Sequence, residues 1–316
     1  MTDERTMTAL EIRQAAERIS AETGAAILLD EALGPHLSMR VGGIVPALIQ
    51  PATPDMAAAV IRALIAACVP HRLLGGGSNL LASDSGLDFA VVDLGAMPAR
   101  GAWSGSTVTA AGGMTFAALL REATQRGLSG LEWAAGLPGT IGGAVVGNAG
   151  AFGSDTAASV RAARLMVTDG SVREHVVRSG DFSYRHSFVR PGELVLDVTL
   201  SLDVSTVELV RAEADRVNRT RAASQPKGGH SSGCVFRNAP EAPAGKLIDE
   251  CGLKGRRRGG AFVSPTHGNF IINDGTATAT DILGLIDEVR AEVRRQKGVE
   301  LQLEVRVWRG SDEEAP

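Results

Sequence analysis

Two glycine-rich segments constrain the fold of this chain more than any other feature of its sequence. The first, residues 73–81, reads LLGGGSNLL, and the second, residues 136–153, reads GLPGTIGGAVVGNAGAFG. The 316 residues include 38 glycines, well above the usage of about 7% in average proteins. Glycine lets the backbone approach another group closely or adopt a positive φ, and its N–H groups can bind the oxygens of a diphosphate. We therefore predict a phosphorylated cofactor here, with turns and close packing alone as the alternative.

The two best-known phosphate motifs do not fit these segments. The spacing Gly75-x-Gly77 begins a dinucleotide fingerprint, but Leu80 stands where the third glycine belongs. The sequence GxxxxGK[ST] of a P-loop does not occur. The cofactor should therefore be held by another kind of glycine-rich cradle.

Charge and cysteine content exclude several other classes of protein. The formal net charge of −4 argues against a nucleic-acid binder. Three widely spaced cysteines are not a disulfide framework and indicate a reducing compartment. The N-terminus has no apolar signal region, and Arg62 interrupts the longest apolar stretch, so we expect a cytoplasmic protein without a membrane span. His230 and Cys234 have no further ligands nearby, and we expect no metal site.

The order of predicted elements indicates an α+β fold. Helices alternate irregularly with strands, and residues 167–177, with Asp169-Gly170 at their centre, are predicted to form a hairpin. A charged helix begins near residue 205 and leads into a Gly/Ser/Pro-rich loop, so we place a domain boundary near residue 204. Helices are expected at 8–24, 53–68, 115–126, 205–224, 246–251 and 281–297, and strands at 44–49, 72–74, 89–94, 107–111, 193–202, 261–263, 270–272 and 301–308.

Five motifs in a fixed order resemble the UDP-N-acetylenolpyruvoylglucosamine reductase family, in its shorter subtype. They are LLGGGSNLL, GLPGTIGGAVVGNAGAFG, YRHSFV, SSGCVFRN and AGKLIDECGLKG, and the likeness runs from about residue 40 to residue 304. The resemblance implies a two-lobed FAD-binding α+β domain of the vanillyl-alcohol-oxidase/PCMH type over residues 1–204, with its core from about residue 36. A smaller α+β substrate-binding domain would follow over residues 205–316.

The family resemblance implies non-covalent FAD and NADPH as co-substrate. It also implies reduction of UDP-N-acetylglucosamine enolpyruvate to UDP-N-acetylmuramate for peptidoglycan synthesis, so the partner is a small UDP-sugar, with neither nucleic acid nor membrane. The sequence leaves the oligomeric state open, with a monomer favoured. The expected cofactor-binding residues are Gly75, Gly76, Gly77, Ser78, Asn79, Leu80, Gly136, Pro138, Gly139, Thr140, Gly142, Gly143, Asn148 and Gly150.

Three residues match the catalytic positions of the family. Arg185 of YRHSFV would stabilise the enolate formed by hydride transfer from flavin N5 to the enolpyruvyl β-carbon. Cys234 stands where the family usually has a serine proton donor, and its thiol is the more acidic of the two groups. Glu304 would act as an acid/base or orienting partner. Tyr184 and Asn238 match substrate contacts.

Each catalytic residue also has a plainer interpretation. Arg185 could form a surface ion pair, Cys234 could be a small buried apolar residue, and Glu304 could pair with a cross-strand arginine. The run at residues 256–258, RRR, could meet a phosphate or lie in a solvated loop.

The sequence departs from the family at two places, and two other functions stay open. Ser224 replaces a basic residue before Gln225-Pro226, and Gln302-Leu303 replaces a Glu-Pro. The alternatives are another FAD oxidoreductase on the same fold and a non-catalytic module that binds FAD or a UDP-sugar.

Overall fold

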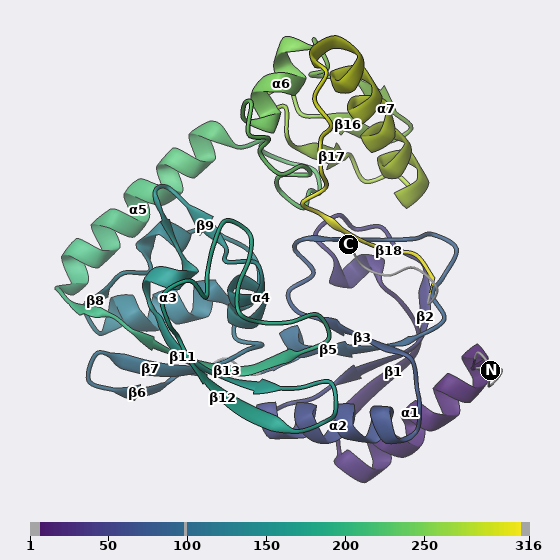
Figure 1. The fold of residues 1–316 in the computed structure, drawn as a ribbon, viewed down its shortest axis with the longest axis vertical. Helices are drawn as coiled ribbons and strands as arrows, with labels where there is room; N and C mark the ends of the chain where they lie inside the picture. Colours follow the sequence, from purple (N-terminus) through teal and green to yellow (C-terminus); the bar gives the residue numbers. More distant parts are fainter. Residues whose placement is uncertain (1–6, 98–99, 311–316) are drawn as a thin grey trace. The chain divides into compact units, whose positions relative to one another are not determined.

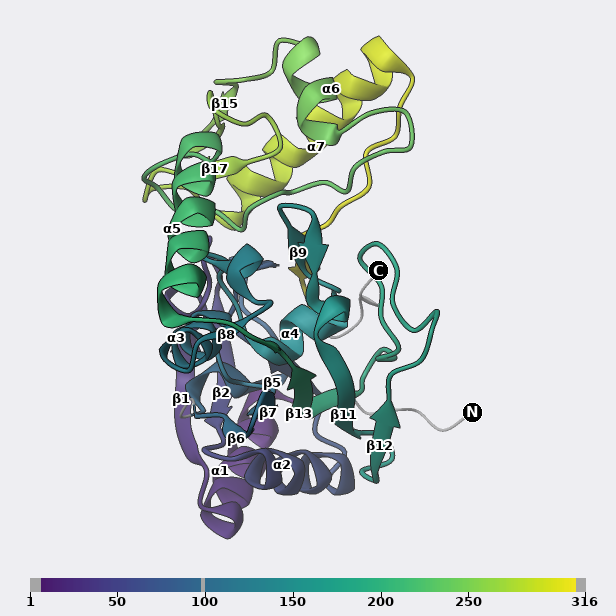
Figure 2. The same cartoon turned by 90° about the vertical axis from the view of Figure 1, so that its left-hand side faces the viewer.

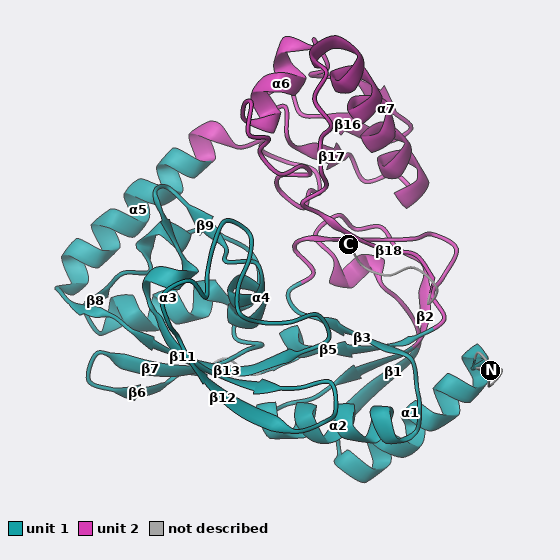
Figure 3. Ribbon diagram, in the orientation of Figure 1, with its two compact units in different colours: residues 1–29, 47–76, 89–221 teal, residues 30–46, 77–88, 222–316 magenta. Residues whose placement is uncertain are grey.

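The computed structural model describes residues 7–97 and 100–310, which form two compact units. The first unit contains residues 1–29, 47–76 and 89–221, and the second contains residues 30–46, 77–88 and 222–316 (Figure 3). Among the described residues, no helix is both long and apolar enough to cross a bilayer.

A small, mostly parallel sheet and two helices begin the fold. The sheet has the order β1-β2-β5-β3, from β1 (Ala26–Ala32), β2 (Ile44–Gln50), β5 (Ala90–Asp93) and β3 (His71–Leu74). Strands β2 and β3 both pair parallel with β5. Helices α1 (Ala9–Thr23) and α2 (Pro54–Ala66) lie side by side, and their buried faces share one core with β2 and β5 (Figure 1).

The helix starts follow from local capping chemistry. Thr8 and Glu11 form the predicted capping box of α1, and the side chain of Thr53 caps α2. Gly24 ends α1 with a φ of 73°, a conformation that glycine adopts readily.

An antiparallel sheet forms the rest of the first unit. Its order is β12-β11-β13-β7-β6, from β12 (Val172–Val176), β11 (Val160–Met166), β13 (Leu194–Ser201), β7 (Thr107–Ala111) and β6 (Ala102–Ser104). The predicted hairpin at Asp169-Gly170 is confirmed, since it joins β11 to β12. Helices α3 (Phe116–Gln125) and α4 (Ile141–Val146) pack on one face, whereas α2 packs on the other (Figure 2).

Short elements complete the first unit. They are β8 (Leu128–Ser129), β9 (Gly150–Ala151), β10 (Ser154–Asp155), β14 (Asp203–Val204) and the 3-10 turns η2 (Leu94–Ala96), η3 (Glu132–Ala134) and η4 (Thr156–Ala158).

The second unit has its own hydrophobic core around helix α7 (Ala279–Lys297). Helix α6 (Ala244–Glu250) and the sheet β15-β16-β17 pack on it, from β15 (Arg257–Arg258), β16 (Ala261–Val263) and β17 (Ile271–Asn273). Strand β4 (Leu80–Ala82) pairs parallel with β18 (Arg306–Trp308), and η1 (Gly34–His36) precedes them in the chain. The carboxylate of Asp84 accepts hydrogen bonds from the N–H groups of Ala279 and Thr280 and so caps α7.

The division between the units differs from the boundary near residue 204. Helix α5 (Val207–Ser224) buries Val210, Ala214 and Val217, of which the last two belong to the core of the first unit. The unit therefore ends after Arg221, inside this helix, and segments near residues 30–46 and 77–88 join the second unit. The roles of these parts in binding cofactor and substrate are taken up under Proposed function.

Candidate active site

The two glycine-rich segments contact each other within the first unit. A Cβ atom at Gly76 would lie 2.8 Å from the Cα of Gly139, and one at Gly75 would lie 2.8 Å from Oγ1 of Thr140. Because both distances are shorter than a Cβ contact allows, only glycine permits this approach. Residues 75–76 of the first segment and 139–140 of the second therefore lie directly against each other.

Helix α4 begins at this contact. Thr140 is 3% exposed, and its Oγ1 accepts a hydrogen bond from the N–H of Gly143 at 3.3 Å. The N–H of Gly142 donates to the carbonyl of Gly112 at 2.7 Å. The side chain of Thr140 thus caps the helix, which fixes the glycine segment against the five-stranded sheet.

The backbone at Gly75 and Gly76 keeps donors that the rest of the fold does not use. Their N–H groups donate to no acceptor among the described residues. Backbone N–H groups left in this way suit phosphate oxygens, so the segment fits the diphosphate of a dinucleotide such as FAD.

A cation lies beside the second glycine segment. Nε of Arg221 donates to the carbonyl of Ala135 at 2.9 Å, and its guanidinium lies 5.0 Å from the ring centroid of Phe152. Gly136 has a φ of 74°, and a Cβ there would lie 3.1 Å from Cδ of Arg221. Burial lowers the pKa of Arg221 from its ordinary value, yet the group stays charged at neutral pH.

The end of the second glycine segment is tied down by side-chain hydrogen bonds. Asn148 is 5% exposed and donates to Asp155 Oδ2 and to the carbonyl of Ser183, both at 3.1 Å. Gly150 pairs with Asp155 in the β9–β10 ladder. Since the amide nitrogen of Asn148 makes these two bonds, a cofactor contact by this residue would come from its backbone or from Oδ1.

The remaining residues of the first motif belong to the second unit. Gly77 has a φ of 60°, and a Cβ there would clash with the carbonyl oxygen of His36. Asn79 donates from Nδ2 to the carbonyl of Glu304 at 2.9 Å, and Leu80 pairs with Arg306 where β4 meets β18. Ser78 lies in the turn between Gly77 and Asn79. The motif therefore contacts a predicted catalytic residue directly.

Glu304 lies in a β-bulge opposite the residue that follows Cys234. The N–H groups of Glu304 and Val305 both donate to the carbonyl of Val235, at 2.8 and 3.3 Å. Two residues of one segment thus oppose a single residue of the other, the pattern that re-aims a side chain beside active sites. Sequence reasoning expected one continuous strand over residues 301–308, which is wrong because the bulge leaves only Arg306–Trp308 as strand.

Cys234 is half-buried at the start of the segment that faces this bulge. It forms an isolated antiparallel bridge with Phe270, and the next residue, Val235, donates to the carbonyl of Asn269 at 2.9 Å. Asn269 is 2% exposed, and its amide bonds both the N–H and the carbonyl of Phe236. The structure therefore fixes the backbone around Cys234 from two sides and brings it next to the segment of Glu304.

Arg185 lies in the first unit, at the second position of a two-residue turn. Ser183 and His186 exchange both backbone hydrogen bonds, each 3.1 Å long. Arg185 has a φ of 55°, and its guanidinium lies 5.4 Å from the ring centroid of Tyr184. Tyr184 is 59% exposed. The three predicted catalytic residues thus belong to different units, with Arg185 in the first and Cys234 and Glu304 in the second.

Asn238 and the arginine run at residues 256–258 both lie in the second unit. Oδ1 of Asn238, an exposed residue, accepts a hydrogen bond from the N–H of Ala244 at 3.1 Å. The arginine run at residues 256–258 is neutralised by carboxylates, since Arg256 and Arg258 pair with Glu288 and the middle arginine pairs with an aspartate. These ion pairs argue against a phosphate site, although the run lies partly in strand β15 and not in the expected loop.

Two cations near the bulge were missed by sequence reasoning. Arg237 follows the Cys234 segment, and Arg306 begins β18 directly after the bulge. Arg306 is exposed as a residue, yet desolvation of its guanidinium, with the charge of Arg237 as the smaller cause, lowers its pKa. The spacing Glu304-x-Arg306 was visible in the sequence, but only the structure shows that a second cation lies near it.

The described residues contain no group of three or more His, Cys, Asp or Glu side chains that could hold a metal ion.

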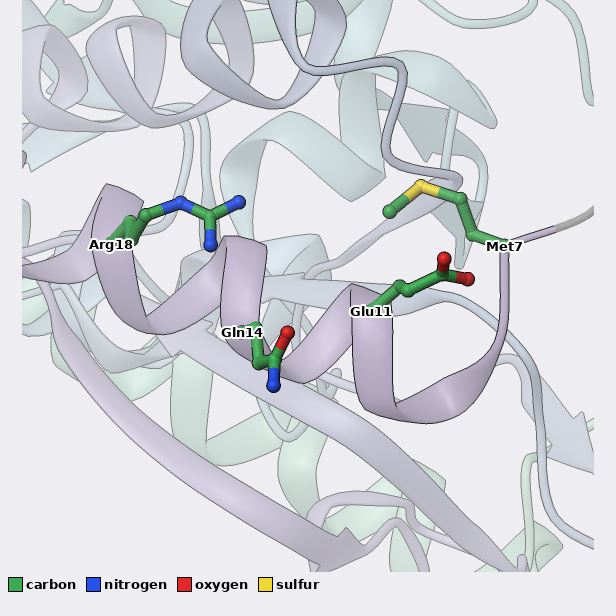
Figure 4. A pocket seen from close by; sticks show the side chains of 4 residues that line it. All are labelled: Met7, Glu11, Gln14 and Arg18. Atoms are coloured by element: carbon green, nitrogen blue, oxygen red, sulfur yellow. The ribbon is translucent and has the colours of Figure 1, made fainter.

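A depression of about 230 Å³ lies on α1, where Glu11, Gln14 and Arg18 project beside Met7 (Figure 4). A second, of about 220 Å³, includes Trp133 and Phe152. Neither is lined by a residue predicted for the site.

Comparisons with known proteins agree with this geometry. Residues 45–175 match the model of an FAD binding domain, and residues 225–308 match that of the C-terminal domain of UDP-N-acetylenolpyruvoylglucosamine reductase. The reductase of that name from Caulobacter vibrioides is 38% identical over 89% of this chain and 94% of its own length. A second such reductase, from Symbiobacterium thermophilum, is 40% identical over 88% of this chain and 91% of its own length. The crystal structure of the Thermus caldophilus reductase covers 90% of this chain and 98% of its own, with 34% identity and a TM-score of 0.75.

The fold and the matched domains define an FAD-dependent oxidoreductase with an α+β cofactor domain and a smaller C-terminal domain. The chain belongs to the UDP-N-acetylenolpyruvoylglucosamine reductase family. The predicted family, fold class, enzyme class and FAD cofactor are thus confirmed.

Proposed function

We propose that this enzyme reduces UDP-N-acetylglucosamine enolpyruvate to UDP-N-acetylmuramate in the cytoplasm, as a step of peptidoglycan precursor synthesis, with NADPH as the electron donor. The observation that carries the proposal is the pairing in the second unit of the Cys234 segment with the bulge at Glu304. It is supported by the family relatives and by glycine backbone suited to a diphosphate.

Bound FAD would supply the hydride chemistry, taking two electrons from NADPH and delivering them to the β-carbon of the substrate double bond. Hydride transfer leaves a negative charge on the substrate, which the protein has to stabilise. The electron pair of the double bond moves to the α-carbon and its carboxylate, where the guanidinium of Arg185 stabilises the developing negative charge. The planar fork of a guanidinium also matches the geometry of a carboxylate.

Cys234 completes the reaction by donating its Sγ proton to the α-carbon, and the thiolate regains a proton from solvent. A thiol is far more acidic than a hydroxyl, so it can deliver a proton to a strongly basic carbanion. Glu304 orients this exchange from the neighbouring segment, where the two hydrogen bonds of the bulge and that from Asn79 fix its backbone.

Arg237 and Arg306 would hold the diphosphate of the substrate. A diphosphate brings two negative charges, whereas the charge that acts on Arg306 is that of a second cation, Arg237. Bringing an anion between two like charges relieves their repulsion, which makes this pair a better anion site than either cation alone. Asn238, four residues after Cys234, would contact the same substrate.

The cofactor would be held by the glycine-rich segments. Gly75, Gly76 and residues 136–150, all in the first unit, would bind it. Residues 77–80 stay predicted cofactor contacts. Arg221 would add a positive charge beside the second glycine-rich segment.

Product analysis tests this assignment. Purified enzyme given NADPH and the enolpyruvyl UDP-sugar without oxygen should consume the two in equal amounts, and the product should carry two added hydrogen atoms by mass spectrometry. NADPH consumption that occurs only with oxygen, leaving the UDP-sugar unchanged, would refute the proposal in favour of an oxidase.

A further inference from the structure

The turn that carries Arg185 is anchored to the second glycine segment on both of its sides. On the N-terminal side, Nδ2 of Asn148 donates to the carbonyl of Ser183 at 3.1 Å. On the C-terminal side, Oγ of Ser187 donates to the carbonyl of Val146 at 3.1 Å. Val146 is the last residue of α4, and Asn148 follows two positions later, so both anchors come from one short stretch.

Asn148 is built into this position. Its Nδ2 also donates to Oδ2 of Asp155, and its Oδ1 accepts from the N–H of Ala157 at 3.2 Å. The side chain is 5% exposed, and its two N–H bonds and one acceptor site are used. A buried amide with all these partners has one orientation, so it holds the Ser183 carbonyl in a defined place.

Ser187 is buried to a similar degree, with 4% exposure. Besides donating to Val146, its Oγ accepts a hydrogen bond from the N–H of Val189 at 3.3 Å. The hydroxyl therefore fixes both the end of α4 and the chain that leaves the turn.

The turn itself needs outside support. Arg185 has a φ of 55°, a conformation that is unfavourable for a residue with a side chain and persists where the surroundings enforce it. Tyr184, the other turn residue, is 59% exposed. The anchors therefore lie at the flanks of the turn, at Asn148 and Ser187.

We propose that Asn148 and Ser187 are positioning residues, which hold the guanidinium of Arg185 where the negative charge develops. This inference rests on the proposed role of Arg185 in the reaction. Asn148 would then position Arg185 in addition to its predicted role in cofactor binding. Ser187 was not among the predicted site residues.

The test separates the two halves of the reaction by stopped-flow absorbance under anaerobic conditions. In Ser187→Ala, reduction of the flavin by NADPH should stay within about twofold of the parent rate, and Asn148→Ala is compared with the parent at equal flavin occupancy. Re-oxidation by the enolpyruvyl UDP-sugar should slow roughly 10- to 100-fold, because a small misplacement of a catalytic group has effects of that size.

Thr156→Val is the matched control. Thr156 is 2% exposed and its Oγ1 donates to the carbonyl of Ala149 at 2.9 Å, so the variant removes a buried hydroxyl bond beside Asn148 without touching the turn. It should lower the melting temperature and leave re-oxidation unchanged. Equal slowing in this control would overturn the inference.

A double-mutant cycle with Arg185→Ala gives the decisive readout. Once the guanidinium is gone, removal of Asn148 or Ser187 should slow re-oxidation by less than about twofold further, because residues that act through one another are not additive. Full additivity would overturn the inference, as would loss of flavin from both Asn148→Ala and Ser187→Ala. Normal re-oxidation in Arg185→Ala alone would instead refute the proposed role of Arg185.

Discussion

Nδ2 of Asn79 donates a hydrogen bond to the backbone carbonyl of Glu304, 2.9 Å away and 225 residues later in the chain. The backbone carbonyl of Asn79 in turn accepts from the N–H of Arg306 at 3.1 Å. The asparagine of the first glycine-rich motif thus holds both flanks of the bulge that carries Glu304. A motif expected to bind the cofactor therefore also fixes the backbone of the segment that carries Glu304.

Asn79→Asp should disturb this bulge. The substitution replaces the donor with a carboxylate oxygen that faces the Glu304 carbonyl, so we expect a loss of about 1 kcal/mol in the free energy of unfolding. Re-oxidation of the flavin by substrate should slow as well, and urea denaturation with stopped-flow absorbance would measure both. Ser83→Ala, which removes an exposed hydroxyl contact to Ser85, is the control. Parental re-oxidation in Asn79→Asp would show that the contact is only structural.

The identity of the proton donor can be tested at Cys234. Cys234→Ser should retain substantial turnover, because a hydroxyl can also protonate a strongly basic carbanion. Cys234→Ala should still let NADPH reduce the flavin but should lower product formation by roughly 100-fold or more. Single-turnover absorbance together with product analysis would measure both steps. Normal turnover in the alanine variant would remove Cys234 from the mechanism.

Loss of Arg237 or Arg306 should affect substrate binding more than the rate of the chemical step. Arg306→Ala and Arg237→Ala should each raise KM for the UDP-sugar by about tenfold, the size of one charge-assisted contact, with a smaller effect on kcat. The double variant should weaken binding further. Arg256→Ala, which removes a cation paired with Glu288, should leave KM unchanged. If all three single variants behaved alike, the diphosphate would not lie between Arg237 and Arg306.

Stability should fall in mild acid, partly through His267. Its Nδ1 accepts a hydrogen bond from the N–H of Asn269 at 3.2 Å, which requires a neutral ring. Burial, with a smaller contribution from Lys254, lowers the pKa of His267 below its ordinary value of 6.5. The unfolded chain therefore binds a proton first, and the free energy of unfolding decreases as pH falls from about 6.5 through the lowered folded pKa.

His267→Gln should make this pH dependence shallower. Thermal unfolding from pH 7.5 to 5.5 would show it, with one proton accounting for at most about 1.4 kcal/mol per pH unit. Burial also lowers the pKa of His71, so that residue contributes with the same sign. An unchanged slope after both histidines are replaced would contradict this explanation.

Local features of the fold could be predicted from the sequence because their causes lie within a few residues. The capping box at Thr8 and Glu11 and the hairpin at Asp169-Gly170 are examples. The family and its cofactor followed from five motifs in a fixed order.

The geometry of the site could not be predicted in the same way. The bulge at Glu304 depends on pairing with Val235, and the anchor from Asn148 depends on a carbonyl 35 residues later. Neither contact has a spacing or a residue type that marks it. The arginine run at residues 256–258 shows the converse, since its charge was obvious but its partners Glu288 and Asp274 were not.

The most direct test of the proposed reaction is an anaerobic visible spectrum of the purified protein, recorded alone, after NADPH, and after the enolpyruvyl UDP-sugar. The account predicts a yellow protein whose flavin absorbance is bleached by NADPH and restored by the UDP-sugar. Denaturation should then release the flavin, since it is bound without a covalent link. A flavin that is bleached by NADPH but stays reduced after the UDP-sugar is added would contradict the proposed reaction.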